Sequence, residues 1–305
     1  LGLQGARDVG RVSWRYGGQV AKDELVRSTD LTNANFTDRS YVTFSVVPSI
    51  ETELESGNTV QWRFGATVDY SNRDSNQVSP LLGVTLRTQS AAASIDYSLE
   101  YAATSQVPGY TALGSGPSGL FGGNAFLGRE KAKQLSASIF RRADGWTLSA
   151  TLFSRYDDNL VDWTYSTLSP FSRQANAVDI DVVGFEAFVI RNWDAVDLAI
   201  GFTVFDKDAD YGSAQVDASF YALNFAKQRA TLALTYRFAE SFELRLDNEY
   251  RSQEDNPLRV GDDSAYLASL SLLWTSPGER NIGVAFVVDN ATDSTYQPFP
   301  GTPAS

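Results

Sequence analysis

The chain has 305 residues, contains neither cysteine nor histidine, and carries 25 Lys and Arg against 37 Asp and Glu, which gives a net charge of −12. These counts exclude disulfide frameworks, thiolate zinc sites and catalysis by a cysteine or histidine side chain. The acidic balance argues against nucleic acid as a partner, because phosphate binding requires a basic surface. No stretch of 18 apolar residues occurs, so a membrane could be crossed by strands but not by helices.

Alternation of apolar and polar residues, which is typical of β-strands with two different faces, recurs along the chain. The alternating runs lie at 12–16, 60–70, 95–101, 146–152, 196–204, 230–238, 242–250, 266–274 and 282–288. About 13 strands and no amphipathic helix are expected in all. Near residues 182–184 the alternation slips by one position, which predicts a β-bulge.

Strand length and connection length both favour a membrane barrel. Many runs are about 10–13 residues long, and membrane-spanning strands need about 9–11, whereas soluble strands average about 5–6. Outer-membrane barrels alternate short periplasmic turns with long exterior loops. The short connections here are 142–145, 192–195, 239–241 and 275–281, and the long ones are 20–40, 103–131, 157–177, 206–226, 252–264 and 289–305.

Charged residues occupy one parity of the stretch 241–251, and apolar residues occupy most of the other. Charges facing lipid would each cost about 2–4 kcal/mol at the bilayer midplane, whereas a wet lumen accommodates both signs. The apolar rows are therefore expected to face lipid, with an aromatic girdle near the turns at Trp146, Trp193, Phe238, Phe242 and Trp274. The residues expected to face the lumen, where they could equally form a self-satisfying charge ladder, are Arg63, Asp96, Glu100, Glu243, Arg245, Asp247, Glu249 and Arg251.

The segment 283–305 resembles the last loop region of TonB-dependent outer-membrane receptors. The match is a V-x-N-x-x-D-x-x-Y pattern made by Val288, Asn290, Asp293 and Tyr296, followed by a loop rich in proline and glycine. It departs from the family pattern at residue 291, where alanine stands in place of the usual leucine.

Two further segments are similar to the same family. GNAFLGREKAKQLSASIF (123–140) resembles the family segment that leads into a barrel strand. The matching positions are Gly123, Asn124, Leu127 and Glu130, and an arginine stands where proline is usual. DDNLVDW (157–163) resembles a strand-to-loop segment of the D-x-I type. The order of the motifs along one series of strands, over roughly residues 80–305, identifies the chain as a member of this family.

The resemblance implies an antiparallel transmembrane β-barrel of 22 strands, preceded by a plug domain and a TonB box. We expect residues 1–305 to be a single barrel segment, with the N-terminal plug and the final strand absent from it. The implied function is TonB-dependent uptake of a siderophore, a cobalamin or an oligosaccharide across the outer membrane of a Gram-negative cell. The implied partners are outer-membrane lipid, the plug, the TonB complex and a small-molecule or oligosaccharide ligand. No enzymatic activity and no required cofactor are expected.

Two groups of loop residues are candidate sites. Exterior aromatic side chains could bind a ligand through their flat faces, or pack the loops on one another: Tyr110, Phe121, Phe126, Trp163, Tyr165, Phe171, Tyr211, Tyr221, Tyr296 and Phe299. Within 206–217, Asp206, Asp208 and Asp210 have the D-x-D-x-D spacing that offers oxygen ligands to calcium. The alternative interpretation of these aspartates is a solvated acidic loop.

Three other functions stay open at this point. A passive porin shares the strands and girdles but has a self-contained barrel with a constricting loop. A structural subunit of a larger outer-membrane assembly also fits the pattern. A soluble β-sandwich binding module would reverse the faces and bury the apolar rows between two sheets.

Overall fold

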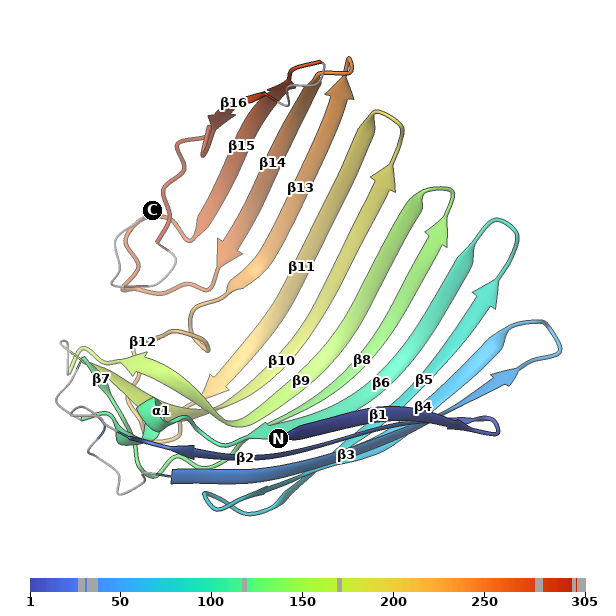
Figure 1. Ribbon diagram of the computed structural model, residues 1–305. Coiled ribbons are helices and arrows are strands. Elements are labelled where there is room, and N and C mark those ends of the chain that lie inside the picture. The colour runs from blue at the N-terminus through green and yellow to red at the C-terminus, as the bar shows by residue number, and fades with distance from the viewer. Residues whose placement is uncertain are drawn as a thin grey trace.

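The computed structural model describes residues 1–26, 31, 38–116, 120–168, 172–277, 282–297 and 300. Its strands form one 16-stranded sheet, in which the long strands follow one another in chain order and each pairs antiparallel with the next. The sheet curves along its width into an arc (Figure 1). The two short strands β7 and β12 lie off the main path, and at the loop end β7 pairs with β10 and β12 pairs with β9.

The elements have the following bounds. The strands of the main path are β1 (Gly2–Val9), β2 (Val12–Glu24), β3 (Asp38–Glu53), β4 (Thr59–Ser71), β5 (Gln77–Gln89), β6 (Ser94–Gln106), β8 (Glu130–Ala143), β9 (Trp146–Tyr165), β10 (Arg173–Asn192), β11 (Val196–Asp210), β13 (Ala226–Phe238), β14 (Phe242–Gln253), β15 (Ser264–Thr275) and β16 (Gly283–Val288). The remaining elements are α1 (Tyr110–Gly114), β7 (Phe121–Gly122) and β12 (Ala218–Ser219).

The expected antiparallel all-β architecture is confirmed, with one more long strand than the sequence predicts. The additional strand is β1, which pairs with β2 from Gly2↔Gln19 to Val9↔Val12. Its sequence GLQGARDV has glycines where an alternating strand would place larger side chains. Without a row of large apolar residues it gives no clear period-two signal.

The cross-strand register separates the side chains into two unlike faces. One face carries Trp62, Leu82 and Leu99, whose side chains are 53%, 55% and 49% exposed, and we call it the outward face. The other carries Arg63, Gly83 and Glu100. Since the described strands form a single sheet and nothing covers the apolar row, a soluble sandwich with that row in its core is excluded.

Ion pairs identify the polar side as the concave face of the arc. The Arg63 guanidinium on β4 lies 2.5 Å from the Glu100 carboxylate on β6, across Gly83 of the intervening strand β5. A Cβ atom on Gly83 would lie 3.5–3.6 Å from both groups. Side chains two strands apart converge in this way on the inner side of a curved sheet, so the expected polar interior lies on the concave face.

The long and short connections lie at opposite ends of the strands, with two departures from expectation. The connection 72–76 is short although it lies at the loop end. The predicted loop 157–177 is wrong for most of its length, because β9 continues to Tyr165 and β10 begins at Arg173. Those two strands form a hairpin that extends beyond their neighbours, and its inward-leaning tip carries β7 and β12 (Figure 1).

The predicted bulge at 182–184 is also displaced. The ladder runs unbroken through Val182 and Gly184, and the register shifts instead between Val178 and Ile180, opposite Asn159. Asn159 has a φ of 56°, a left-handed conformation that asparagine tolerates better than most residues. The sequence misleads here because Val182, on the concave face, is buried in an apolar cluster of the loops, so apolar residues stand on both faces at 182–183.

The described residues contain one helix, α1, which has five residues. None of the described helical structure is both long and apolar enough to span a membrane.

Candidate functional site

Ion pairs join most of the charged side chains on the concave face. Glu249 accepts hydrogen bonds from Arg229 on β13 at 2.8 Å and from Arg251 on its own strand. Asp247 accepts two from Arg245, at 2.7 and 3.1 Å. These neighbours of opposite sign neutralise one another across and along the strands, which is the charge-ladder alternative considered above.

The ladder continues on both sides of β14. Near the tight turns, Arg237 pairs with Asp197 and lies 3.8 Å from Glu243. Further along the arc, the Arg87 guanidinium donates two hydrogen bonds to Asp96, at 3.0 and 3.2 Å. The structure therefore places all eight charged residues named from the sequence on the concave face, where each has a partner of opposite charge.

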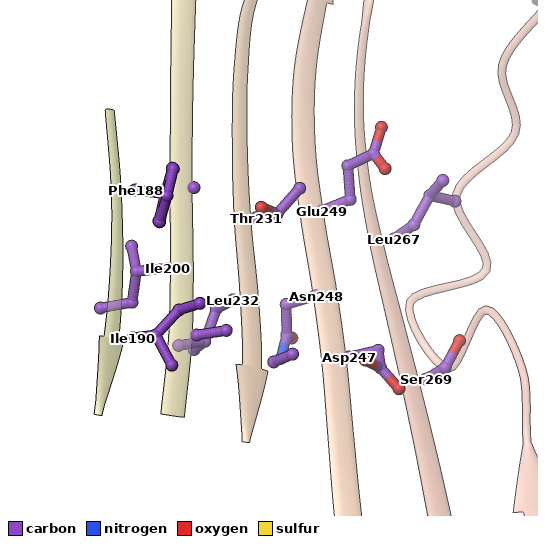
Figure 2. Close-up of a pocket in the computed structure, with 13 residues that line it drawn as sticks. Phe188, Ile190, Ile200, Thr231, Leu232, Asp247, Asn248, Glu249, Leu267 and Ser269 are labelled. Carbon is purple, nitrogen blue, oxygen red and sulfur yellow. The ribbon is translucent and has the colours of Figure 1, made fainter. Parts of the chain in front are cut away.

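A hollow of about 650 Å³ lies along the wall at β10, β11, β13, β14 and β15. Figure 2 shows Phe188 and Ile190 at one end of it, and Asp247, Glu249 and Ser269 at the other. Between these ends the lining residues on the concave face are small, with Gly201, Ala199 and Ala233 among them. The hollow thus has apolar side chains of β10 at one end and, at the other, the ion-paired carboxylates of β14 beside Leu267 and Ser269 of β15.

The segments at the loop end pack together into one unit, which we call the loop cap. It comprises the described residues of 107–129, of the hairpin extension 159–178 and of the connection 211–225. Its core consists of two apolar clusters. The two clusters lie on opposite faces of the hairpin extension. One contains Leu113, Leu127 and Ala175, and the other contains Val178, Ile180 and Ala222. The extension is therefore covered on both sides.

Three of the aromatic residues named from the sequence meet in the loop cap. The ring of Phe121 packs edge-on against Trp163 with centroids 5.3 Å apart. The ring centroid of Phe220 lies 6.2 Å from that of Phe121. The Arg173 guanidinium stacks over Tyr165 at 5.2 Å and over Phe220 at 4.8 Å. These contacts support the alternative in which the rings pack the loops on one another, and ligand binding by them stays a prediction.

Asp162 is a functional candidate that sequence reasoning missed. Its side chain is fully buried and accepts hydrogen bonds from the Tyr211 hydroxyl at 2.7 Å and from the backbone N–H groups of Tyr221 and Ala222 at 3.1 and 2.9 Å. Burial, and to a lesser degree this carboxylate, raises the pKa of Tyr211 well above its ordinary value. The segment 157–163 was singled out by family resemblance, but nothing in it signals which distant loop Asp162 holds.

The other predicted aromatic residues are dispersed. Tyr110 donates its hydroxyl proton to the Asp23 carbonyl at 3.0 Å, the Arg251 guanidinium lies 4.8 Å from the ring of Tyr296, and Phe126 is 97% exposed. Phe171 and Phe299 lie outside the described residues. The described members of the set are therefore spread over separate parts of the loop end, and ligand binding by the ten residues stays a prediction.

The predicted calcium ligands do not sit in a loop. Asp206, Asp208 and Asp210 belong to β11, where they alternate with Lys207 and lie on the outward face. Their partners across the ladder are Val183, Asp181 and Asp179. In the part of the chain that the structure describes, no three Asp or Glu side chains are arranged to hold a metal ion. Calcium binding at 206–217 stays a prediction of the sequence.

No protein-family profile matches the chain, and no curated protein is similar to it in sequence. Solved structures do resemble it. The siderophore receptor PirA from Pseudomonas aeruginosa aligns at 16% identity with a TM-score of 0.68, over 98% of this chain and 52% of that one. The FrpB iron transporter from Neisseria meningitidis aligns at 13% identity with a TM-score of 0.66, over 98% of this chain and 50% of the transporter. The ferric enterobactin receptor PfeA from Pseudomonas aeruginosa, in complex with enterobactin, aligns at 13% identity with a TM-score of 0.67. That alignment covers 99% of this chain and 49% of the receptor.

The chain thus spans about half the length of the receptors that it resembles. At these identities the likeness concerns the fold, and it covers nearly every residue of this chain. It agrees with the motifs at 123–140, 157–163 and 283–305, whose strands β8, β9 and β16 belong to the same sheet. The chain has the barrel fold of the TonB-dependent outer-membrane receptor family.

Proposed function

We propose that this chain is barrel wall of a TonB-dependent receptor that takes up a scarce nutrient across the outer membrane, with a ferric siderophore as the first ligand to test. The similar structures include receptors described as binding siderophores or enterobactin, which favours that ligand over a cobalamin or an oligosaccharide. The plug of the same protein and the TonB complex are the partners that such transport requires.

The observation that carries the proposal is the contrast between the two faces of one curved sheet. An outward face with Trp62, Leu82 and Leu99 half exposed suits acyl chains, whereas water would oppose so much apolar surface. A concave face lined with paired charges suits a wet passage. The loop cap stands over the end of the strands where a ligand from outside would arrive.

Uptake by cells tests the transport proposal directly. The full-length protein would be expressed in a strain that lacks its own siderophore receptors, and accumulation of iron-55 from ferric siderophores would be measured with and without an uncoupler of the proton-motive force. We expect saturable accumulation that the uncoupler abolishes. Accumulation of labelled cobalamin or oligosaccharide instead would change the ligand class and leave the mechanism standing.

Conductance separates the receptor from a passive porin. In planar bilayers the full-length receptor should show no steady open channel, because a plug occupies the lumen at rest. A stable conductance that persists without energy would favour the porin. Uptake of none of these ligands, together with co-purification in a defined outer-membrane complex, would favour the structural subunit.

A further inference from the structure

Charged side chains on the outward face are sorted by strand end. Near the tight turns, the ones on described strands are Arg7, Arg141 and Arg191. Near the loops, Lys22, Lys131 and Lys133 accompany a set of acidic side chains: Glu24, Asp38, Asp158, Asp179, Asp181, Asp206, Asp208 and Asp210. On the described strands, the outward charges near the tight turns are therefore all positive, while the turns themselves carry acids such as Asp144 and Asp194.

Arg191 lies between two tryptophan rings at this edge. Its guanidinium carbon is 5.2 Å from the ring centroids of both Trp146 and Trp193, which pack edge-on against each other at 6.0 Å. Gly145 makes room for it, since a Cβ there would lie 2.9 Å from Nη1 of Arg191. The turn Asp144–Gly145 has φ values of 47° and 76°, as a two-residue hairpin turn requires.

Arg141 and Arg191 have no carboxylate partner among the described residues, whereas most arginines of the concave face have one. Each of Arg63, Arg87 and Arg245 forms an ion pair, whereas neither outward arginine pairs with any described acid, Asp144 and Asp194 of the adjoining turns included. Nε and Nη1 of Arg191 are buried without a hydrogen-bond partner. A cation placed beside lipid without a counter-charge requires an anion from its surroundings.

We propose that Arg141 and Arg191, together with Trp146 and Trp193, bind the phosphate of an anionic phospholipid in the periplasmic leaflet. Guanidinium groups recognise phosphate oxygens through paired N–H donors, and tryptophan rings favour the level of the headgroups. Arg141 pairs with Leu148 and Arg191 with Trp146 across the two sides of β9, so strand spacing sets their Cα atoms roughly 12 Å apart. Both arginines lie on the outward face, so a headgroup between the two strand positions would be within reach of side chains of this length. The site rests on the membrane placement of the wall and goes beyond nutrient uptake.

Lipid retention by the purified protein tests this site. The full-length protein would be exchanged into vesicles of phosphatidylcholine alone or mixed with phosphatidylglycerol, released into detergent, and examined by native mass spectrometry for the lipids that stay bound. We expect phosphatidylglycerol to be retained in preference to phosphatidylcholine. R141Q and R191Q should each reduce that preference about fivefold, and added salt should reduce it further.

Arg142 supplies a matched control, because it is the next residue on β8 and lies on the concave face. R142Q should retain the preference of the wild type, and heat-modifiable gel migration should show that every variant is folded. Equal retention of both lipids by the wild type, or the same loss in R142Q as in R141Q, would overturn the site. R141Q keeps the test decisive if R191Q fails to fold. Iron uptake by R141Q should be unchanged, which separates a failure here from a failure of the transport proposal.

Discussion

At the scale of single residues, Asp162 matters most because it holds a loop by polar contacts in a buried position. Three donors converge on one carboxylate, from Tyr211, Tyr221 and Ala222. Removing a buried acceptor leaves its donors unsatisfied, at about 1–3 kcal/mol each. In D162A the connection 211–225 should therefore open more readily, by about 3 kcal/mol or more.

Hydrogen exchange at the amides of Tyr221 and Ala222 measures this opening. D162A should lose protection there while the amides of β13 and β14 keep theirs, since the change is local. D162N retains one acceptor oxygen and should lose roughly half as much protection energy. Unchanged exchange in D162A would show that the connection is held by its apolar contacts alone.

A second residue-scale contact makes the loop cap sensitive to acid. Asp217 accepts hydrogen bonds from the backbone N–H and the hydroxyl of Thr167, at 2.7 and 2.8 Å, and these lower its pKa below the ordinary value of 3.8. A carboxyl group with a lowered pKa stabilises the folded state above its unfolded pKa, and that stabilisation is lost as the pH falls through the folded value.

We therefore expect the contact between 166–168 and Asp217 to weaken on acidification from about pH 5 to about pH 2. An acid-stable protease such as pepsin, used across that range, would detect cleavage near Thr167. D217N cannot titrate, so its cleavage should follow only the protease's own pH profile. A wild type that follows D217N throughout would contradict the assignment.

At the scale of elements, the bulge at Asn159 decides which side chains each face of the hairpin extension presents. It allows Leu160 and Asp162 to face the connection 211–225 while Trp163 packs on Phe121. Deleting one residue from a strand exchanges its two faces. Deletion of Asn159 should therefore turn Asp162 away from its three donors and release both covering loops, with the strands of the wall still folded.

Limited trypsin digestion would report this release as new cleavage at Arg129 or Arg173. N159G is the matched control, because glycine keeps the residue count and adopts the same positive φ without strain. N159G should digest like the wild type. If the deletion variant also does so, the extension tolerates either phase and the bulge does not determine the packing.

The same element shows how far sequence alone could predict this fold. Clean alternation in β4, β6, β13 and β14 predicts the strands, their faces and the polar interior, because lipid on one side and water on the other impose period two. The extension 159–178 escapes this reasoning because protein covers both of its faces. Contacts such as Asp162 with Tyr221, 59 residues apart, join loops whose meeting no local pattern encodes.

At the scale of the whole molecule, the two faces of the sheet differ in how their charged side chains are paired. The concave face holds most of its charges in pairs, whereas the outward face leaves its described arginines near the turns without carboxylates. The loops add a separate layer, built from apolar clusters and a few buried polar contacts. The wall and the loop cap can therefore be perturbed independently, and the residue-scale variants above exploit this.

The assignment of the faces makes the most general prediction. Leu232 and Ala233 are adjacent on β13, and the first lies on the outward face while the second lines the concave hollow beside Asp247. In a bilayer, L232R should lower the free energy of unfolding by about 2–4 kcal/mol, because its charge would face acyl chains. A233R should cost far less, since its charge would face water and an existing carboxylate. Urea unfolding of the full-length protein in vesicles, followed by tryptophan fluorescence, measures the free energy of unfolding of both variants. A larger loss of that free energy in A233R than in L232R would mean that lipid and lumen have been assigned to the wrong faces.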